Sequence, residues 1–290
     1  MQKGFFAQDH VNVSFSTLNT ASTISEALTS GSIQMASGAS FNVITADAKG
    51  ASYQAVANMG GITLELCTSK SYAQSKGITS GASVAATLKK FKGATFGLTG
   101  FNSPPQFVLN YMLKHFAGLS AQTDVHEVSL GGVSTEQAAL QRGEIQAFFQ
   151  SPPTCQESSS YGVPVVETSA MSQLRSVPYA MLYGTKSWIS SHKTVVREVA
   201  QAIARADAYV KAHPAATAAV LHKSSFSKVP TSVIEHALTS VVIPAIPSGG
   251  AMTEAGWQSA NAIMTQSGAT SATPSATSGV MWTNSYLSGK

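Results

Sequence analysis

The chain has few cysteines, few charged residues and no long apolar run. Its 290 residues include two cysteines, Cys67 and Cys155, whose separation fits no metal-binding motif. We expect both to be small buried or partly buried residues, with a disulfide between them as the alternative. No apolar stretch approaches the about 20 residues that a membrane-spanning helix needs. The first residues also lack the pattern of a secretory signal peptide, which by itself favours a cytosolic protein.

Charged residues make up only 11% of the sequence, and the net charge of +4 comes from 18 basic and 14 acidic residues. The one basic cluster, Lys89, Lys90 and Lys92, is interpreted as a solvated helix end, so no nucleic-acid partner is predicted. With 43% hydrophobic residues, the composition is that of a folded protein whose surface is rich in Ser, Thr, Ala, Gln and Asn, as is common in exported proteins. A chain of this length can form two lobes of ordinary domain size.

The common catalytic and cofactor motifs are missing. There is no Gly-x-Ser-x-Gly nucleophile elbow, no His-Glu-x-x-His, no P-loop, no Gly-x-Gly-x-x-Gly and no Cys-x-x-Cys. The seven histidines stand singly, and His126 and Glu127 are neighbours on an expected strand, where adjacent side chains face opposite ways. We therefore expect no enzyme activity, no cofactor and no metal.

Strand-like and helix-like segments alternate, which predicts a doubly wound α/β fold. The expected strands are residues 11–18, 33–36, 54–57, 62–67, 94–98, 125–130, 143–149, 163–166 and 177–184, where 54–57 and 62–67 form a pair or one broken strand. The expected helices are residues 23–29, 41–49, 104–116, 134–142 and a long amphipathic helix through 196–210. Residues 70–83, rich in serine, are interpreted as the crossover into a second lobe.

Several motifs resemble, in the right order, the nitrate/sulfonate/taurine-type receptors of ABC transporters. The start Lys3-Gly4-Phe5-Phe6 is similar to the family's "kGFF" element, and the alternating residues 11–15 are similar to its "ldVelv" strand. Residues 28–36 resemble its "aLasGeidfa" segment, with Ser32 and Gln34 in place of the usual acids. Weaker matches continue along nearly all of the chain.

The resemblance implies a two-lobed type II periplasmic binding protein fold, in which each lobe is a doubly wound sheet flanked by helices and the ligand lies in the interlobe cleft. Residues 1–75 and 176–290 would form a discontinuous first lobe, and residues 76–175 the second. In the family, a signal sequence and a first strand precede the "kGFF" helix, whereas here that motif starts at residue 3. We therefore expect a truncated N-terminus, with Met1 inside the first helix and with the export signal and first strand lost.

The resemblance also implies a function. We expect a periplasmic or extracellular, membrane-associated monomer that captures a small anion such as a sulfonate, taurine or nitrate by lobe closure and delivers it to an ABC permease. A receptor for a thiamine-pyrimidine or other heterocyclic precursor is the alternative. A thiamine-pyrimidine-synthase-like enzyme would need a cysteine-rich iron motif and a substrate histidine, and this chain has only Cys67 and Cys155. A sensor domain from a larger regulator would carry a membrane or signalling segment in its parent gene.

Four junctions between an expected strand and an expected helix carry small polar residues: residues 36–40, 99–104, 131–134 and 149–153. Ligands of open α/β sheets lie beyond the carboxyl ends of strands, where helix N-termini present unpaired amides and a partial positive charge. No Arg or Lys lies in the junctions, so amides and hydroxyls would meet the charge of a ligand, with Arg175 as the nearest cation. Phe101, Phe149 and Tyr179 would either wall an organic moiety or belong to the core.

The predicted ligand-binding residues are taken from these junctions, with Tyr179 from the return strand. They are Ser37, Gly38, Ser40, Thr99, Gly100, Phe101, Asn102, Ser103, Ser134, Gln150, Ser151 and Tyr179. The alternative is that the junctions only cap helices, because Ser103 with Gln106 and Ser134 with Gln137 have the spacing of a capping box.

Overall fold

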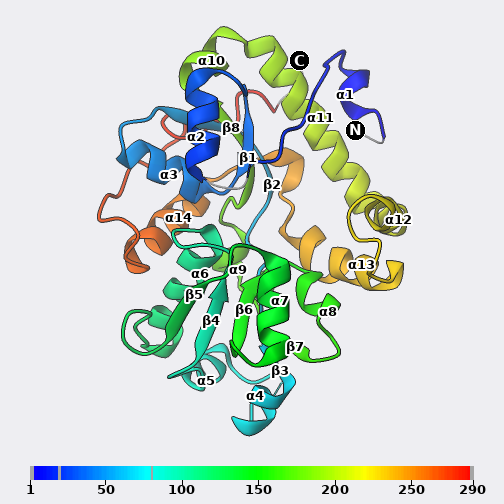
Figure 1. Cartoon of the computed structure of the whole chain (residues 1–290). Coiled ribbons are helices and arrows are strands. Elements are labelled where there is room, and N and C mark those ends of the chain that lie inside the picture. Colours follow the sequence, from blue (N-terminus) through cyan, green and yellow to red (C-terminus); the bar gives the residue numbers. More distant parts are fainter. Residues whose placement is uncertain (1–2, 19–20, 80, 288–290) are drawn as a thin grey trace.

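The computed structural model describes residues 3–18, 21–79 and 81–287, and its strands form two separate sheets (Figure 1). The first sheet has the order β1–β8–β2, in which β1 (Ala36–Gly38) and β2 (Tyr53–Gly60) are both antiparallel to β8 (Ala180–Thr185). The second has the order β5–β4–β6–β3–β7 and consists of β3 (Glu65–Ser69), β4 (Thr95–Leu98), β5 (His126–Ser129), β6 (Ala147–Gln150) and β7 (Gly162–Glu167). The predicted two-lobed α/β fold is confirmed.

In the second sheet, β4 runs parallel to β5 and β6, whereas β3 runs antiparallel to β6 and β7. All five residues of β3 are buried, including the polar Glu65, Thr68 and Ser69, because β3 lies between β6 and β7 in the sheet. The carboxyl ends of β4, β5 and β6 lie at one edge of the sheet, because these strands are parallel. Helices α6 (Pro104–Met112) and α7 (Val133–Arg142) follow β4 and β5 and begin at that edge.

Helices surround both sheets (Figure 1). Those of the second lobe are α4 (Lys70–Ser75), α5 (Val84–Lys89), α6, α7, α8 (Thr154–Glu157) and α9 (Ser172–Arg175). Those of the first lobe include α2 (Ala21–Ser30), α3 (Ser40–Ala48), α10 (Lys186–Ser191) and α11 (Lys193–Ala212), with α1 (Phe5–Gln8) packed on α11. The C-terminal part holds α12 (Pro214–Ser224), α13 (Thr231–Ala237) and α14 (Glu254–Gln266). Short 3₁₀ turns lie at Thr168–Ala170, Ile243–Ala245 and Ser248–Gly250, and π turns at Leu113–Ala117 and Leu238–Val242.

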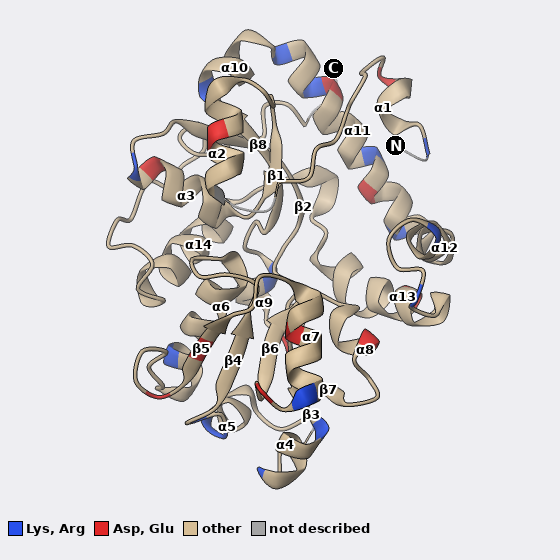
Figure 2. Cartoon of the chain, in the orientation of Figure 1, with Lys and Arg blue, Asp and Glu red and all other residues tan. Residues whose placement is uncertain are grey.

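The few charged residues are scattered over both lobes (Figure 2). Among the described residues, no helix combines the length and the apolar character that crossing a membrane requires.

The two connections between the sheets lie against each other. The chain passes from β2 to β3 through Gly61 and returns to β8 after α9. The backbone N–H of Tyr179 donates to the carbonyl oxygen of Gly60 at 2.9 Å. A Cβ atom at Gly61 would lie 1.7 Å from the carbonyl oxygen of Arg175, so only glycine fits where the connections cross.

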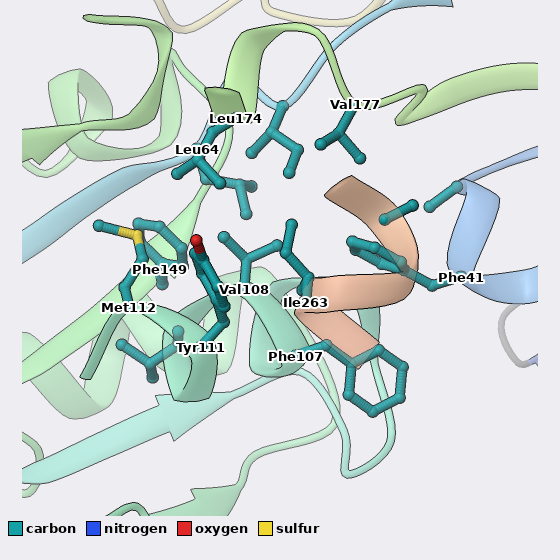
Figure 3. Close-up of a cluster of buried hydrophobic side chains, with 14 of the residues drawn as sticks. Phe41, Leu64, Phe107, Val108, Tyr111, Met112, Phe149, Leu174, Val177 and Ile263 are labelled. Carbon is teal, nitrogen blue, oxygen red and sulfur yellow. The ribbon is translucent and has the colours of Figure 1, made fainter. Parts of the chain in front are cut away.

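Helix α14 joins the two lobes. It packs on α3 of the first lobe and on α6 of the second. Figure 3 shows Ile263 of α14 in one cluster with Phe41 of α3 and with Phe107 and Val108 of α6. The largest apolar cluster is therefore continuous from one lobe to the other, and smaller clusters lie within each lobe.

Residues 11–18, which alternate apolar and polar side chains, do not form the predicted strand; they have no regular structure. The next predicted strand, 33–36, is displaced to β1 (Ala36–Gly38). Alternation indicates which side chains suit a sheet, but a strand also needs a neighbouring backbone to accept and donate its hydrogen bonds. Residues 11–18 pair with no strand in the part of the chain that the structure describes, and Phe15 is 68% exposed. Met1, expected inside the first helix, lies outside the described residues.

Residues 54–57 and 62–67 do not pair with each other, because β2 and β3 lie in different sheets. Strand β3 also falls in the range 1–75, which the sequence assigns to the first lobe, yet it pairs with β6 and β7 of the second sheet. The change of sheet thus comes at residues 60–65, where Gly60 and Gly61 make the crossing rather than a hairpin turn. The division of the chain at residues 75 and 175 stays a prediction.

Cys67 of β3 and Cys155 of α8 form a disulfide, with their Cα atoms 5.5 Å apart. Both side chains are buried, as expected, but the structure shows the alternative of a bonded pair. The partners are 88 residues apart and meet because β3 pairs with β6, which α8 follows. Spacing along the sequence contains no such information, since a disulfide requires close Cα atoms in the fold.

Candidate functional site

A cavity of about 270 Å³ lies between the lobes. Helices α2 and α3 and strands β2 and β8 of the first lobe line one side of it, and α6 with the loop before it lines the other. Its aromatic residues are Phe41, Tyr53, Phe107 and Tyr183, its polar residues include Ser25, Asn42, Thr45 and Asn102, and its charged residues are Glu26 and Lys49.

The aromatic side chains connect the lobes across this cavity. The ring of Phe41, from α3, packs edge-on against that of Phe107, from α6, with centroids 6.0 Å apart. Phe41 also meets the ring of Tyr179 at 6.1 Å, and Tyr53 meets Tyr183 at 5.9 Å. A bound molecule would thus contact apolar walls from both lobes, which is typical of small-molecule sites.

Two tyrosines provide hydroxyl groups beside these walls. The hydroxyls of Tyr53 and Ser25 are hydrogen-bonded at 2.7 Å, and the Tyr53 hydroxyl also donates to the carbonyl oxygen of Ser25. Burial, and to a lesser degree the neighbouring Tyr53, raises the pKa of Tyr183 to about 12. The Tyr183 hydroxyl therefore keeps its proton at neutral pH and can donate a hydrogen bond.

Gly38, at the end of β1, leaves space for this part of the site. A Cβ atom there would lie 3.2 Å from Cε1 of Tyr183 and 3.4 Å from Oδ1 of Asn42. A larger residue would have to displace the Tyr183 ring or the Asn42 side chain, because neither distance leaves spare room. The predicted Gly38 thus adjoins the cavity without itself lining it.

Asn102 lines the cavity from the second lobe in an unusual backbone conformation. Its φ of 57° is one of two positive values among the described residues other than glycine. The Asn102 N–H donates to Oε1 of Gln106 at 2.6 Å, and Nε2 of Gln106 donates to the carboxylate of Glu127 at 2.7 Å. Burial raises the pKa of Glu127, while the hydrogen bond from Gln106 opposes that rise.

The helix N-termini offer fewer free amides than the sequence suggested. In α3, the Ser40 N–H donates to the carbonyl oxygen of Pro178, and the Ala39 N–H donates to Oδ1 of Asn42. Helix α6 begins with Pro104 and Pro105, which have no N–H. Amides of α3 and α6 therefore contribute less to a binding site than expected, and side-chain hydroxyls and amides contribute more.

Neither predicted capping box forms. Gln106 accepts from the N–H of Asn102 and not from that of Ser103, and the Ser103 side chain caps no amide. Helix α7 has Gly132 at its N-cap, so Ser134 lies within its first turn. Gln137 instead donates to the carbonyl oxygen of Thr154. A spacing of three residues permits a capping box but does not select it over partners elsewhere in the fold.

All four predicted junctions do connect a strand to a helix, but they do not meet in one cavity. Of the predicted ligand-binding residues, Asn102 alone lines the interlobe cavity, which Gly38 and Tyr179 adjoin. Ser40 is completely buried, and Ser37 lines a second cavity beside residues 11–15 and α11. Thr99, Gly100 and Ser103 are half-buried, Ser134 and Ser151 are exposed, and Phe101 is 57% exposed.

Gln150 is bonded within the second lobe. Its Nε2 donates to the carboxylate of Glu136 at 3.0 Å, as Nε2 of Gln156 does to Glu65. Both carboxylates are buried, and burial raises the pKa of Glu136 to about 8 and that of Glu65 to about 7. Phe149, with a 1% exposed side chain, belongs to the core rather than to a wall of the site.

The sequence did not indicate most of the residues that line the cavity. Phe41 and Asn42 directly follow the predicted Ser40 in the first turn of α3, so their position in the sequence could have identified them as residues that line the cavity. Tyr53 and Tyr183 lie on strands of the first sheet, whose pairing brings them together. Lys49, at the end of α3, is the cation that lines this cavity, in place of the expected Arg175.

Comparison with known proteins finds solved structures that share this fold. The structure of a protein from Bordetella bronchiseptica RB50 is 23% identical, with a TM-score of 0.74 over 98% of this chain and 88% of that chain. The alkanesulfonate-binding protein SsuA of Xanthomonas axonopodis pv. citri, bound to MOPS, is 16% identical, with a TM-score of 0.71 over 92% of this chain and 87% of that chain. The periplasmic nitrate-binding protein NrtA of Synechocystis PCC 6803 is 16% identical, with a TM-score of 0.65 over 81% and 64% of the two chains.

At these identities the structures show a shared fold, which is that of the receptors the sequence resembles. No curated protein matches the chain. The model of the NMT1-like family matches residues 1–223, which is more than half of the 290 residues. The chain belongs to the NMT1-like family.

Proposed function

We propose that the protein is a non-catalytic solute receptor that binds a small organic anion between its lobes. The observation that carries this proposal is the interlobe cavity, to which α3 contributes Phe41 and Asn42 and α6 contributes Phe107. A ligand that contacts both lobes stabilises the arrangement in which they close on it, and a partner can distinguish that arrangement from the empty one. The receptor acts as a monomer outside the cytoplasm, and its partner is an ABC permease in the membrane.

The ligand that fits best combines a sulfonate or similar anion with an organic part. Lys49 and the hydroxyl and amide groups of Tyr183 and Asn42 would meet the charged end, and Phe41 and Phe107 would cover the apolar part. Inorganic nitrate would leave those aromatic walls without a partner. Taurine and MOPS, both sulfonates with an organic part, are therefore better probes than nitrate. The predicted Gly38, Asn102 and Tyr179 stay in this proposal as residues that shape the site.

A receptor for a neutral heterocycle such as an aminopyrimidine is the second candidate. It is favoured by the same aromatic residues, because a flat ring can stack on or lie edge-on to Phe41, Tyr53 or Phe107. The amide of Asn42 and the hydroxyl of Tyr183 can donate to or accept from ring substituents. The two candidates differ in the role of Lys49, whose ammonium group would contribute binding energy only for the anion.

Calorimetric titration of the purified protein with taurine, MOPS, nitrate and an aminopyrimidine tests the proposal. We expect a sulfonate to bind, Tyr183→Phe to weaken binding about tenfold through the loss of one hydrogen bond, and Lys49→Gln to weaken it further. Tyr209→Phe, on α11 and outside this cavity, is the matched control and should bind as the unaltered protein does. Binding of the aminopyrimidine with no effect of Lys49→Gln would favour the second candidate. Failure of every probe to bind would contradict the proposal.

A further inference from the structure

The loop of residues 99–103, which follows β4, presents Asn102 to the interlobe cavity in a left-handed backbone conformation. Residues other than glycine rarely adopt this conformation, and asparagine tolerates it better than most. Such a conformation persists only where the surroundings hold it, and it is concentrated at functional positions. The question is which group holds Asn102 in place, since its loop has only Gly100 as a glycine.

The backbone amide of Asn102 has one partner, the side-chain oxygen of Gln106, at 2.6 Å. The other end of the same side chain donates to Glu127 on β5, at 2.7 Å. Gln106 is only 9% exposed and lies in the first turn of α6, so its side chain has little freedom to choose other partners. A bridge between an N–H donor and a carboxylate acceptor needs a group that accepts at one end and donates at the other. A side-chain amide does both, whereas a carboxylate or an ammonium group does only one.

Prolines 104 and 105 add to the need for this bridge. Because neither has an N–H, the first two residues of α6 donate no backbone hydrogen bond to the loop. The Phe107 N–H does donate to the carbonyl oxygen of Ser103 at 3.1 Å, but this bond does not reach Asn102. The Ser103 side chain also bonds no amide there. The backbone of Asn102 is therefore held by a side chain, that of Gln106, which lies between α6 and β5.

We propose that Gln106 and Glu127 are positioning residues of the binding site, which hold Asn102 in its left-handed conformation against the interlobe cavity. This rests on the proposed function, in which that cavity receives the ligand. Glu127 fixes the orientation of the Gln106 amide, and the amide oxygen then fixes the backbone of Asn102. Neither residue lines the cavity or touches the ligand.

Amide hydrogen exchange, followed by NMR in the full chain without ligand, tests the bridge directly. Gln106→Glu puts a carboxylate opposite Glu127, and the repulsion between the two carboxylates should move the side chain at position 106 away from both partners. We therefore expect exchange of the Asn102 amide to become about tenfold faster. Adding Glu127→Gln reverses the donor and the acceptor of the pair, so that both hydrogen bonds can form again. Exchange of the Asn102 amide should then return towards its original rate.

Gln156→Glu is the matched control, because Gln156 forms the same kind of bond with the buried Glu65 in the same lobe and makes no contact with Asn102. It should leave exchange of the Asn102 amide unchanged. An unchanged rate in Gln106→Glu would overturn the proposal, as would a double variant that fails to recover. The double variant decides the matter even if Gln106→Glu alone does not fold.

Titration with taurine and MOPS then links the bridge to binding. Asn102→Gly keeps access to positive φ, whereas Asn102→Ala does not, so the alanine variant should bind a probe more weakly than the glycine variant. Equal or stronger binding by the alanine variant would contradict the positioning role. If neither probe binds the unaltered protein, the proposed function fails, while the exchange measurements still decide whether Gln106 and Glu127 hold the loop.

Discussion

The two lobes are stabilised in different ways. The second lobe has a five-stranded sheet, the Cys67–Cys155 disulfide and two buried carboxylates, Glu65 and Glu136, each bonded to a glutamine. The first lobe has a three-stranded sheet with a three-residue edge strand, β1, and neither cysteine lies in it. Yet the first lobe contributes most of the residues that line the interlobe cavity. The comparison indicates that the second lobe is a cross-linked frame, against which a less constrained first lobe presents most of the binding surface.

The largest effect is expected from removing the cross-link of the second lobe. The double substitution Cys67→Ala with Cys155→Ala opens a loop of 88 residues and should lower the free energy of unfolding by about 2–5 kcal/mol. Urea unfolding followed by circular dichroism measures this loss, and amide exchange in β3 and β6 should rise more than in β2 and β8. Chemical reduction of the unaltered protein is the control and should reproduce the shift. If the midpoint did not move, the contrast between the lobes would not depend on the disulfide.

The next largest effect is the dependence of the free energy of unfolding on pH. Burial raises the pKa of Glu136 to about 8 and of Glu65 to about 7 from an unfolded value of 4.5, so the folded protein keeps protons that the unfolded chain releases. The stability from these groups is complete below pH 4.5 and falls as the pH rises towards 8. Each group contributes a slope of up to about 1.4 kcal/mol per pH unit in that window.

Glu136→Gln keeps an acceptor for Gln150 and removes the titration, so it should flatten this slope between pH 5 and pH 8. Measurement of the free energy of unfolding at several pH values checks it. Asp207→Asn is the counterpart in the first lobe, because burial raises the pKa of Asp207 to about 7. It should remove a smaller part of the slope than Glu136→Gln and Glu65→Gln together. A slope that the two glutamate substitutions leave unchanged would refute a pH response based in the second lobe.

The smallest effect concerns the helix between the lobes. Thr253 caps α14 by accepting a hydrogen bond from the N–H of Gly256 at 3.1 Å. Thr253→Ala should cost about 1 kcal/mol, and Thr253→Ser much less. Ser83→Ala removes the corresponding cap of α5 in the second lobe and serves as the control. Thermal unfolding should show the two lobes melting together in both variants, since α14 packs on both; a separate transition in Thr253→Ala would show that the lobes are independent.

Sequence reasoning predicted the second lobe better than the first. Strands β4, β5, β6 and β7 lie where alternating or apolar runs between turn residues indicated them, and each pairs with another strand of the second sheet. Residues 11–18 have an equally good strand pattern but pair with none of the described strands, so the pattern alone could not decide their structure. Register and pairing depend on the whole sheet, and a local sequence does not contain them.

The candidate site was predicted in part. The junctions after β1 and β4 were found from their small polar residues, and Asn102 does line the cavity. Tyr53 and Tyr183 were missed because they lie far apart in the sequence, and only the pairing of their strands brings the two rings together. The spacing between Ser103 and Gln106 suggested a capping role for Gln106. Its side chain instead accepts from the N–H of Asn102, and this bond depends on the backbone conformation of Asn102, which the sequence does not give.

The position of α14 near the end of the chain has a consequence for synthesis. Both sheets are complete once β8 has been made at residue 185, but the helix that packs on α3 and α6 follows only at residues 254–266. During translation from the N-terminus, about 70 further residues must therefore be synthesised before α14 can cover the apolar faces of α3 and α6. At about 5–20 residues per second, this synthesis takes several seconds. A ribosome-bound chain in this interval exposes the surface that α14 will cover, and a chaperone that recognises apolar segments would find it there.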